Sequence, residues 1–242
     1  MQMKKILKKV GWILMAASFM AKLAACSLLN DKNVESACKA LQEKYGESFT
    51  VSAVGDRMGT NHVKLVVCPE GDQGVLFTVT LDRESGTITD DYIVQKVNHM
   101  VDLAVENCGR GLGMELTSIC MLYADETPET EVRDWTPESF LESNGLDRYS
   151  VFLLVDKSTF HAEQLHRVLE TVANSLQVDL TFRIYLLEAE NYTQCVERVS
   201  QNPDANPTTI AKYSPVCDFV VKVNDGVCSM TAEDMGRETE GA

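Results

Sequence analysis

The feature that most constrains this chain is an apolar run from Val10 to Ala25, close to the N-terminus. Four lysines and no acidic residue precede it: Lys4, Lys5, Lys8 and Lys9. A positive segment followed by an apolar segment that ends in small residues is the pattern of a secretory signal. We therefore expect residues 1–25 to be a signal peptide, and the fold to be specified by the 217 residues that follow.

The apolar run ends in Leu23-Ala24-Ala25-Cys26, which resembles the lipobox of bacterial lipoproteins. In that family the cysteine thiol receives a diacylglyceryl group, and a dedicated peptidase then cuts just before the cysteine. The resemblance implies that Cys26 is the lipidated first residue of the mature chain. It also implies a palmitate-type anchor in the cell membrane, with the protein on the extracytoplasmic face.

An uncleaved transmembrane helix is the alternative for this segment. Val10 to Leu29 is 20 residues long, which is enough to span a hydrocarbon core of about 30 Å. Lys22 interrupts the span, however, and a lysine near the bilayer centre costs roughly 2.5–3.5 kcal/mol. Both interpretations put the rest of the chain outside the cytoplasmic membrane, because the N-terminal lysines stay inside.

The charge of the remaining chain limits its partners. Residues 1–25 contain five of the 22 basic residues and no acid, so 17 basic and 36 acidic residues remain, a net charge of −19. Nucleic acid and anionic lipid surfaces repel such a chain. We expect the lipid bilayer as partner through acylated Cys26, a cationic peptide or envelope protein as a further partner, and no nucleic acid. Solubility outside the cell is the simpler explanation of the acidity.

Seven cysteines follow Cys26, and an odd number cannot all form disulfides within one chain. They are Cys38, Cys68, Cys108, Cys120, Cys195, Cys217 and Cys228. None has the Cys-x-x-Cys spacing of a zinc ribbon or a redox dithiol. Most lie at apolar positions of the expected elements, which favours buried free thiols. Cys217 and Cys228 flank an expected hairpin and are the best candidates for a disulfide.

The first part of the mature chain predicts a helix, three strands and a second helix. A short tether, residues 26–32, precedes a helix capped by Asn33, and the second helix ends near residue 110. The order is similar to small secreted PepSY-like modules. The segments Lys44-Tyr-Gly-Glu-Ser-Phe-Thr-Val and Leu81-Asp-Arg-Glu-Ser-Gly-Thr-Ile also resemble uncharacterised lipoproteins of clostridia. We therefore expect an αβββα module over residues 33–110, with an antiparallel meander under helices.

The second part alternates strands and helices. Tyr149 to Val155 is almost continuously apolar, which is typical of a strand covered on both faces. A helix is expected over Phe160 to Leu176, and further strands over Leu180 to Leu187 and Phe219 to Val223. The fold class is therefore α+β: the αβββα module, then an α/β module over residues 112–228 with four or five strands and the Tyr149 strand central. Residues 229–242 are expected to be a disordered acidic tail.

No pattern in the chain predicts a catalytic, metal-binding or cofactor-binding residue. The run Gly109-Arg-Gly-Leu-Gly follows a helix, whereas a phosphate loop follows a strand and opens a helix. His161 and His166 are five residues apart, so their side chains point apart on a helix. The acids around Gly86 do not follow the EF-hand order, because Thr87 and Ile93 stand where Gly and Glu are required.

These observations favour a membrane-tethered lipoprotein with a non-enzymatic binding or accessory role. The alternative is a secreted hydrolase, or a thiol enzyme using Cys120 or Cys68 with a histidine, whose residues converge only in three dimensions. A third interpretation is a structural subunit of an envelope or conjugation assembly. A cleft that gathers two or more histidine, cysteine or acidic side chains within hydrogen-bond reach would favour the enzyme, and scattered polar groups would favour the binding protein.

Overall fold

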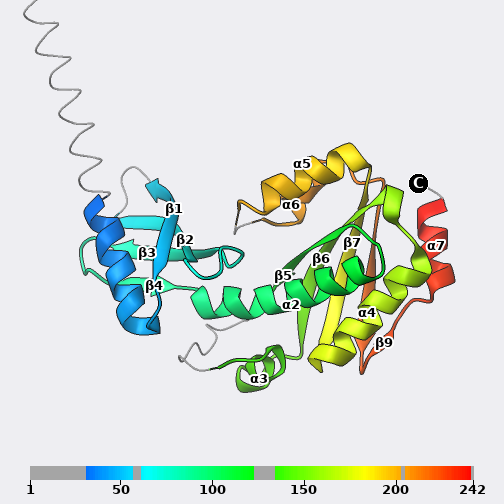
Figure 1. Ribbon diagram of the computed structural model, residues 1–242, viewed down its shortest axis with the longest axis horizontal. Helices are drawn as coiled ribbons and strands as arrows, with labels where there is room; N and C mark the ends of the chain where they lie inside the picture. Colours follow the sequence, from blue (N-terminus) through cyan, green and yellow to red (C-terminus); the bar gives the residue numbers. More distant parts are fainter. Residues whose placement is uncertain (1–30, 57–60, 123–133, 203–204, 241–242) are drawn as a thin grey trace, which may run out of the picture. The chain divides into compact units, whose positions relative to one another are not determined.

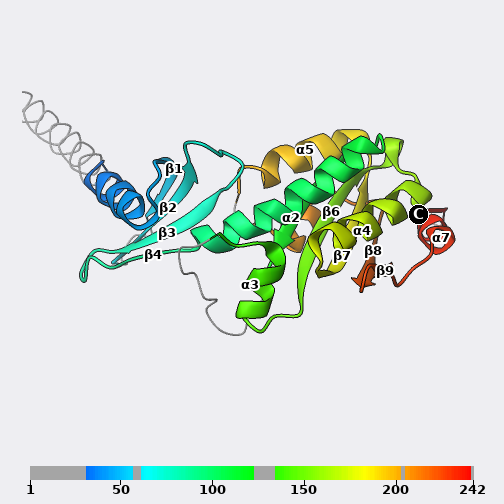
Figure 2. The same cartoon turned by 60° about the horizontal axis from the view of Figure 1, so that its bottom comes forward.

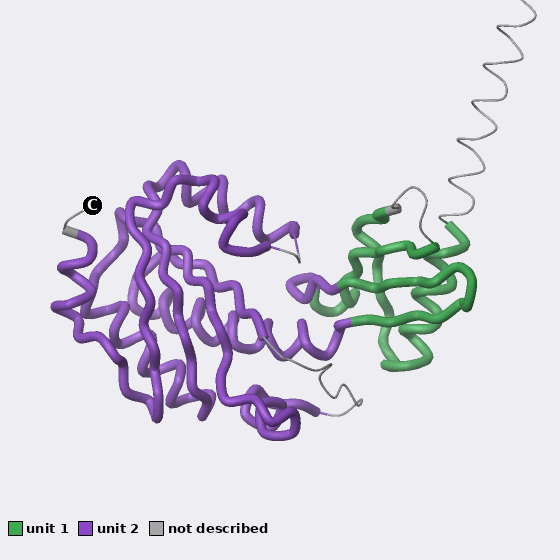
Figure 3. Tube along the Cα trace, turned by 180° about the vertical axis from the view of Figure 1, so that it is seen from behind, with its two compact units in different colours: residues 1–72, 78–90 green, residues 73–77, 91–242 purple. Residues whose placement is uncertain are grey.

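The computed structural model describes residues 31–56, 61–122, 134–202 and 205–240. Cys26 and the whole signal segment lie outside these ranges. The described chain divides into two compact units, coloured in Figure 3. Unit 1 contains residues up to 72 and 78–90, and unit 2 contains residues 73–77 and 91–242. The fold is a mixed α+β fold, as the sequence predicted, and it contains one sheet of four strands and one of five.

Unit 1 contains the four-stranded sheet. Residues 31–45 are helical. Asn33 therefore lies inside this helix and does not cap it. The expected tether over residues 26–32 is wrong at its end, because residues 31 and 32 already belong to the helix. The strands are β1 (Phe49–Asp56), β2 (His62–Pro69), β3 (Phe77–Asp82) and β4 (Ile88–Asp90), in the order β1-β2-β3-β4. The pairs β1–β2 and β3–β4 are antiparallel. The fourth strand was not predicted, because it is only three residues long.

Unit 2 contains the five-stranded sheet, whose strands follow one another in the order β5-β6-β7-β8-β9 (Figure 1). They are β5 (Leu116–Met121), β6 (Arg148–Asp156), β7 (Asp179–Leu187), β8 (Cys217–Asn224) and β9 (Val227–Cys228). Only β6–β7 is a parallel pair, and the other pairs are antiparallel. The β6 strand is interior, and Val151, Leu153 and Val155 are fully buried, as predicted.

Helices cover both faces of this sheet. The α5 (Ala189–Val199) and α6 (Pro207–Ala211) helices pack on Phe152 and Leu154 of β6 and on Tyr185 and Leu187 of β7. Side chains alternate along a strand, so Val151, Leu153 and Val155 face the opposite layer. That layer is formed by α2 (Tyr92–Gly111) and α4 (Ala162–Leu176). The remaining elements are α3 (Pro137–Ser143), the 3-10 turn Lys157–Thr159 and α7 (Ala232–Glu240).

Two boundaries differ from those expected from the sequence. The α2 helix was assigned to the first module, but it packs on β5 and α4 and belongs to unit 2. Gly109 explains this packing, because a Cβ there would lie 2.4 Å from the Leu116 side chain of β5. Gly109 is therefore a point of close contact between α2 and β5. Residues 232–240 form α7 beside α4 and β8 (Figure 2), so the chain does not end in a disordered tail from residue 229.

All seven described cysteines are free thiols. Cys217 and Cys228, the best candidates for a disulfide, lie at opposite ends of the β8–β9 hairpin, because Cys228 pairs with Val223 rather than with Cys217. Among the described helices, none is both long and apolar enough to cross a membrane.

Candidate functional site

A cleft of about 410 Å³ lies in unit 2 along β5, the edge strand of the five-stranded sheet. One wall is the side of α2 from Val94 to Glu106, and the floor is β5 from Thr117 onward. The opposite wall comes from the end of α5 and the segment after it, including Val199 and Ala205. Gln73, Gly74 and Leu76 also line the cleft. The volume suits a small molecule, because ligand pockets are typically about 300–1,000 Å³.

The polar side chains of the cleft come mainly from one stripe of α2. Asn98, Asp102 and Glu106 follow one another at intervals of four residues, so they lie on one helical face. This stripe lies beside the buried stripe that contains Val97, Val101 and Val105. Because the buried stripe holds α2 against the sheet, the polar stripe faces the free edge of β5.

Two carboxylates from α2 accept hydrogen bonds from this edge strand. The Ser118 amide donates to Glu106 Oε1 at 3.1 Å, and the Ser118 hydroxyl donates to Asp102 Oδ1 at 2.6 Å. The Cys120 amide also donates to the Asp102 carboxyl. An edge strand leaves alternate backbone N–H groups without a neighbouring strand. Asp102 and Glu106 therefore satisfy two donors that a sixth strand would otherwise take.

Desolvation of the carboxyl raises the pKa of Asp102 to about 7, although part of the residue's surface stays exposed to the cleft. The Ser118 hydroxyl opposes this rise, and the negative charge of Glu106 adds to it. Neither carboxylate forms an ion pair with a lysine, arginine or histidine of the described chain, and no described lining residue is lysine or arginine. The described lining of the cleft is thus acidic and contains no lysine or arginine.

Cys120 lies in the same cleft but has the wrong chemistry for a nucleophile. Its thiol is buried and donates to Asn98 Oδ1 at 3.6 Å. Burial raises the pKa of the Cys120 thiol well above its usual value, and the neighbouring Asp102 charge raises it further. The thiolate, which is the reactive form, is therefore disfavoured at neutral pH. His99 lines the cleft as well.

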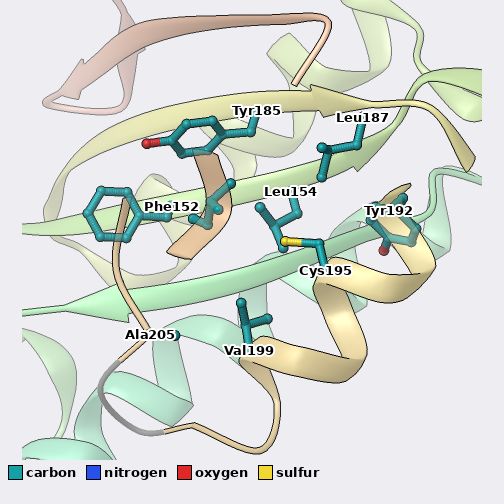
Figure 4. Close-up of a cluster of buried hydrophobic side chains, with 9 residues drawn as sticks. Phe152, Leu154, Tyr185, Leu187, Tyr192, Cys195, Val199 and Ala205 are labelled. Carbon is teal, nitrogen blue, oxygen red and sulfur yellow. The ribbon is translucent and has the colours of Figure 1, made fainter. Parts of the chain in front are cut away.

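The wall opposite α2 is set by a hydrophobic cluster under α5, shown in Figure 4. Tyr192, Cys195 and Val199 project from one face of α5 onto the side chains of β6 and β7. On the same side of the sheet, the hydroxyls of Tyr192 and Thr117 are 3.1 Å apart. These contacts fix α5 against the sheet, and Val199 and Ala205 extend from the cluster into the wall of the cleft.

The structure separates most of the residues considered in the sequence. Cys68 lies in unit 1, where its thiol donates to the Thr50 carbonyl. His161 is the exposed N-cap position of α4, without a side-chain capping bond. His166 instead lies half-buried beside Glu170 on the same helix, with Nδ1 and Oε2 3.7 Å apart. Asp82 accepts the amides of Glu84 and Ser85, so its carboxylate stabilises a turn.

Cys120 was considered as a nucleophile, but Asn98, Asp102, Glu106 and Ser118 were missed because each lies in an ordinary helix or strand. A signal was present, since Asn98, Asp102 and Glu106 repeat at i, i+4 and i+8 next to an apolar stripe. The partners Ser118 and Cys120 could not be read from the sequence, because the register of β5 against α2 depends on the Gly109–Leu116 contact.

No family model matches the sequence, and no curated protein is similar to it. A crystal structure of a DUF5037 family protein from Ruminococcus gnavus is similar in fold, with a TM-score of 0.65 and 14% sequence identity. The likeness covers 86% of this chain and 99% of that chain. At this identity it supports the fold and transfers no activity or site residue.

Proposed function

We propose that the protein is a membrane-tethered extracytoplasmic lipoprotein with a binding role, and that the cleft between α2 and β5 takes an ammonium or guanidinium group. The observation that carries the binding site is the desolvated Asp102 carboxyl, which lies beside Glu106 in a cleft whose described lining has no lysine or arginine. A bound organic cation would supply the missing charge and lower the pKa of Asp102. The net charge of −19 beyond residue 25 favours the same class of ligand.

The apolar part of the lining limits what the cation can be attached to. Ile119, Met121 and Val199 lie in the cleft with the two carboxylates. Amphipathic cations, such as a lysine or arginine side chain or an alkyl diamine, match both features, because their methylene stems can cover apolar surface while the charged end stays polar. Inorganic cations would leave the apolar wall unused.

The binding site is tested by calorimetric titration of the full-length chain in detergent with methylguanidinium, 1,5-diaminopentane and a lysine-containing tripeptide. We expect at least one probe to bind with saturable heat. Asp102→Asn should weaken that binding about tenfold or more, since hydrogen bonds to charged groups contribute about 1.5–3 kcal/mol. Asp147→Asn removes an exposed carboxylate that pairs with Arg148 on the surface and serves as control. Equal binding by wild type and Asp102→Asn, or no binding by any probe, would refute the cleft as a cation site.

The membrane tether rests on the Leu23-Ala24-Ala25-Cys26 resemblance and is tested separately. Two or more acyl chains anchor a protein stably, at roughly 0.8 kcal/mol per buried methylene. We expect wild type to partition into detergent, to carry incorporated palmitate and to begin at Cys26. Cys26→Ser removes the thiol that accepts the lipid, so it should carry no label and keep its signal segment or be cut elsewhere. An unmodified Met1 start on most wild-type molecules, seen by mass spectrometry, would favour a retained helix instead.

One specific observation supports the hydrolase alternative. The Ser118 hydroxyl donates to Asp102 at 2.6 Å, and a carboxyl with a pKa near 7 is suited to accept a proton at neutral pH. The cleft thus gathers two carboxylates around one serine, which is more than scattered polar groups. A fluorophosphonate probe decides between the two functions: labelling of Ser118 in wild type, lost in Ser118→Ala, would favour the hydrolase. The thiol-enzyme version has less support, because the Cys120 thiol is held protonated.

A further inference from the structure

A second cluster of side chains lies at the other edge of the five-stranded sheet, where α4 packs against β9. His166 and Glu170 are one helical turn apart on α4, and Cys228 is the last residue of β9. One donor atom from each of the three lies within 4.8 Å of the other two. All three residues are partly buried, so they are shielded from bulk water yet reachable by an ion.

We propose that His166, Glu170 and Cys228 bind a zinc ion through the imidazole Nδ1, a carboxylate oxygen and the thiolate sulfur. The donors match zinc chemistry, which combines nitrogen, oxygen and sulfur ligands in a tetrahedral site. The thiolate excludes calcium and magnesium, which take oxygen ligands. Three protein donors leave the fourth position for a water molecule, as in open zinc sites.

The distances are close to those that zinc requires. Zinc lies about 2.0–2.2 Å from nitrogen and oxygen and about 2.3 Å from sulfur, so tetrahedral donors are roughly 3.4–3.7 Å apart. The His166 Nδ1 to Glu170 Oε2 distance is already 3.7 Å, and the largest separation in the set is under 4.8 Å. Side-chain rotations that move the donor atoms by about 1 Å would therefore bring all three to the spacing of zinc ligands.

Rigid elements hold Cys228 at this place. Its amide donates to Glu170 Oε1 at 3.3 Å, and its thiol lies 3.9 Å from the His166 carbonyl. The hairpin that carries it is fixed to α4 at the turn, where Asn174 Nδ2 donates to the Gly226 carbonyl at 3.4 Å. Gly226 has φ +74, and a Cβ there would lie 2.1 Å from Asn174 Oδ1. Ligands carried on supported elements make a preorganised metal site.

The competing explanation is purely structural: Glu170 caps the free amide of an edge strand and pairs weakly with His166. This explains Glu170 but gives no role to the thiol, whose sulfur is turned toward the same helix face. On zinc binding, the Cys228 thiol loses its proton to solvent and a sulfur–zinc bond replaces the sulfur–hydrogen bond, so binding releases one proton. The structural explanation predicts no such release.

The test uses the full-length chain in detergent, stripped with a chelator and then titrated with Zn²⁺ or with Co²⁺ as a spectroscopic probe. We expect one zinc per chain after dialysis and a sulfur-to-cobalt charge-transfer band. Cys228→Ser should abolish the band, and His166→Asn or Glu170→Gln should weaken binding about tenfold or more. Gln at position 170 can still accept the Cys228 amide, so the Glu170→Gln variant keeps the local fold.

Two variants serve as matched controls. Cys217→Ser removes another half-buried free thiol of the same hairpin, and His161→Asn removes the other histidine near α4. Both should bind zinc and cobalt as wild type does. The proposal is overturned if wild type retains no zinc, or if the cobalt band survives in Cys228→Ser. It is also overturned if Cys217→Ser or His161→Asn removes the band, because the ion would then lie elsewhere.

Discussion

At both edges of the five-stranded sheet, a carboxylate from a helix accepts a backbone amide of the edge strand, but the side chains around the two carboxylates differ. At β5, Glu106 and Asp102 from α2 accept the amides of Ser118 and Cys120. At β9, Glu170 from α4 accepts the amide of Cys228. In both places a helix supplies acceptors to an edge strand, which prevents the strand from pairing with another chain.

The two edges differ in the side chains that surround these carboxylates. At β5 two carboxylates and a buried thiol line a cleft whose described lining has no lysine or arginine, so this edge favours a charged ligand. At β9 a histidine, a carboxylate and a partly buried thiol converge on one point, so this edge favours a coordinated metal ion. A carboxylate at a sheet edge is therefore not by itself a binding site. Its neighbours decide which ligand, if any, it can take.

The largest effect is expected from the strand that both edges depend on. Leu153 is fully buried in β6, paired with Ser118 of β5 on one side and Ile184 of β7 on the other. Leu153→Ala should lower the free energy of unfolding by about 2–5 kcal/mol, because it removes buried methyl groups and leaves a cavity. Urea denaturation measures the loss. If hydrogen exchange then speeds up at the β5 amides but not at Cys228, the two edges do not belong to one cooperative sheet, and their comparison fails.

The next effect separates the edges by pH. The pKa of Asp102 is raised to about 7 in the folded state, against about 3.9 in an unfolded chain. Between these values the folded chain holds a proton that the unfolded chain has released. The protonated Asp102 carboxyl therefore contributes fully to the free energy of unfolding below about pH 4, and this contribution is lost as the pH rises through 7. The total change is up to about 4 kcal/mol.

Asp102→Asn should remove this slope, since an amide does not titrate and its oxygen can still accept from Ser118 and Cys120. The free energy of unfolding, measured from about pH 5 to pH 8, should fall in wild type and fall less in Asp102→Asn. Asp147→Asn, an exposed surface control, should keep the wild-type slope. Parallel slopes in all three proteins would mean that the β5 edge carries no desolvated carboxyl.

A smaller effect tests how closely α2 must approach β5. Gly109→Ala would place a Cβ 2.4 Å from the buried Leu116 side chain. Overpacking costs about 1–3 kcal/mol, and the better helix propensity of alanine returns about 1 kcal/mol. We expect a net loss of about 0–2 kcal/mol and weaker ligand binding in the cleft.

Gly236→Ala in α7 is the matched control for this contact. There the new Cβ would lie 3.9 Å from the Ala162 Cβ, an ordinary packing distance. This variant should gain up to about 1 kcal/mol from helix propensity. Equal thermal stabilisation of both variants would show that Gly109 is not a close contact, and that α2 has room to move away from β5.

The elements specified by neighbouring residues could be predicted from the sequence. The apolar run after Tyr149 predicted an interior strand. The start of α3 is likewise specified by neighbouring residues, because Thr136 and Ser139 form a capping box. The α4 pattern through Leu165 and Val168 predicted its buried face. In each case the residues that specify the element lie within it, so no tertiary contact is needed to recognise it.

The sites depend on pairs that are distant in sequence. Ser118 meets Asp102 across 16 residues, and Cys228 meets Glu170 across 58. The five-residue spacing correctly separated His161 from His166, but it could not show that Glu170, one turn after His166, is the neighbour of that histidine. The helix after residue 91 was assigned to the wrong module for the same reason: its apolar face fits any sheet, and its contacts with β5, such as Gly109 with Leu116 and Asp102 with Ser118, are visible only in the fold.

The smallest expected effect tests whether the two edges share one device. Glu106→Gln and Glu170→Gln each remove a charge but keep an oxygen that can accept the strand amide. The Glu170–His166 contact is 3.7 Å long and partly exposed, and such pairs contribute about 0–1 kcal/mol. Both variants should therefore change the free energy of unfolding by less than about 1 kcal/mol in the absence of ligand and metal. The alanine variants should cost more, about 1–3 kcal/mol each, because a partly buried amide loses its partner.

If Glu170→Gln costs as much as Glu170→Ala while Glu106→Gln stays neutral, the charge matters at β9 and not at β5. The carboxylate at β9 would then act through His166, and the amide of Cys228 would be incidental to its role.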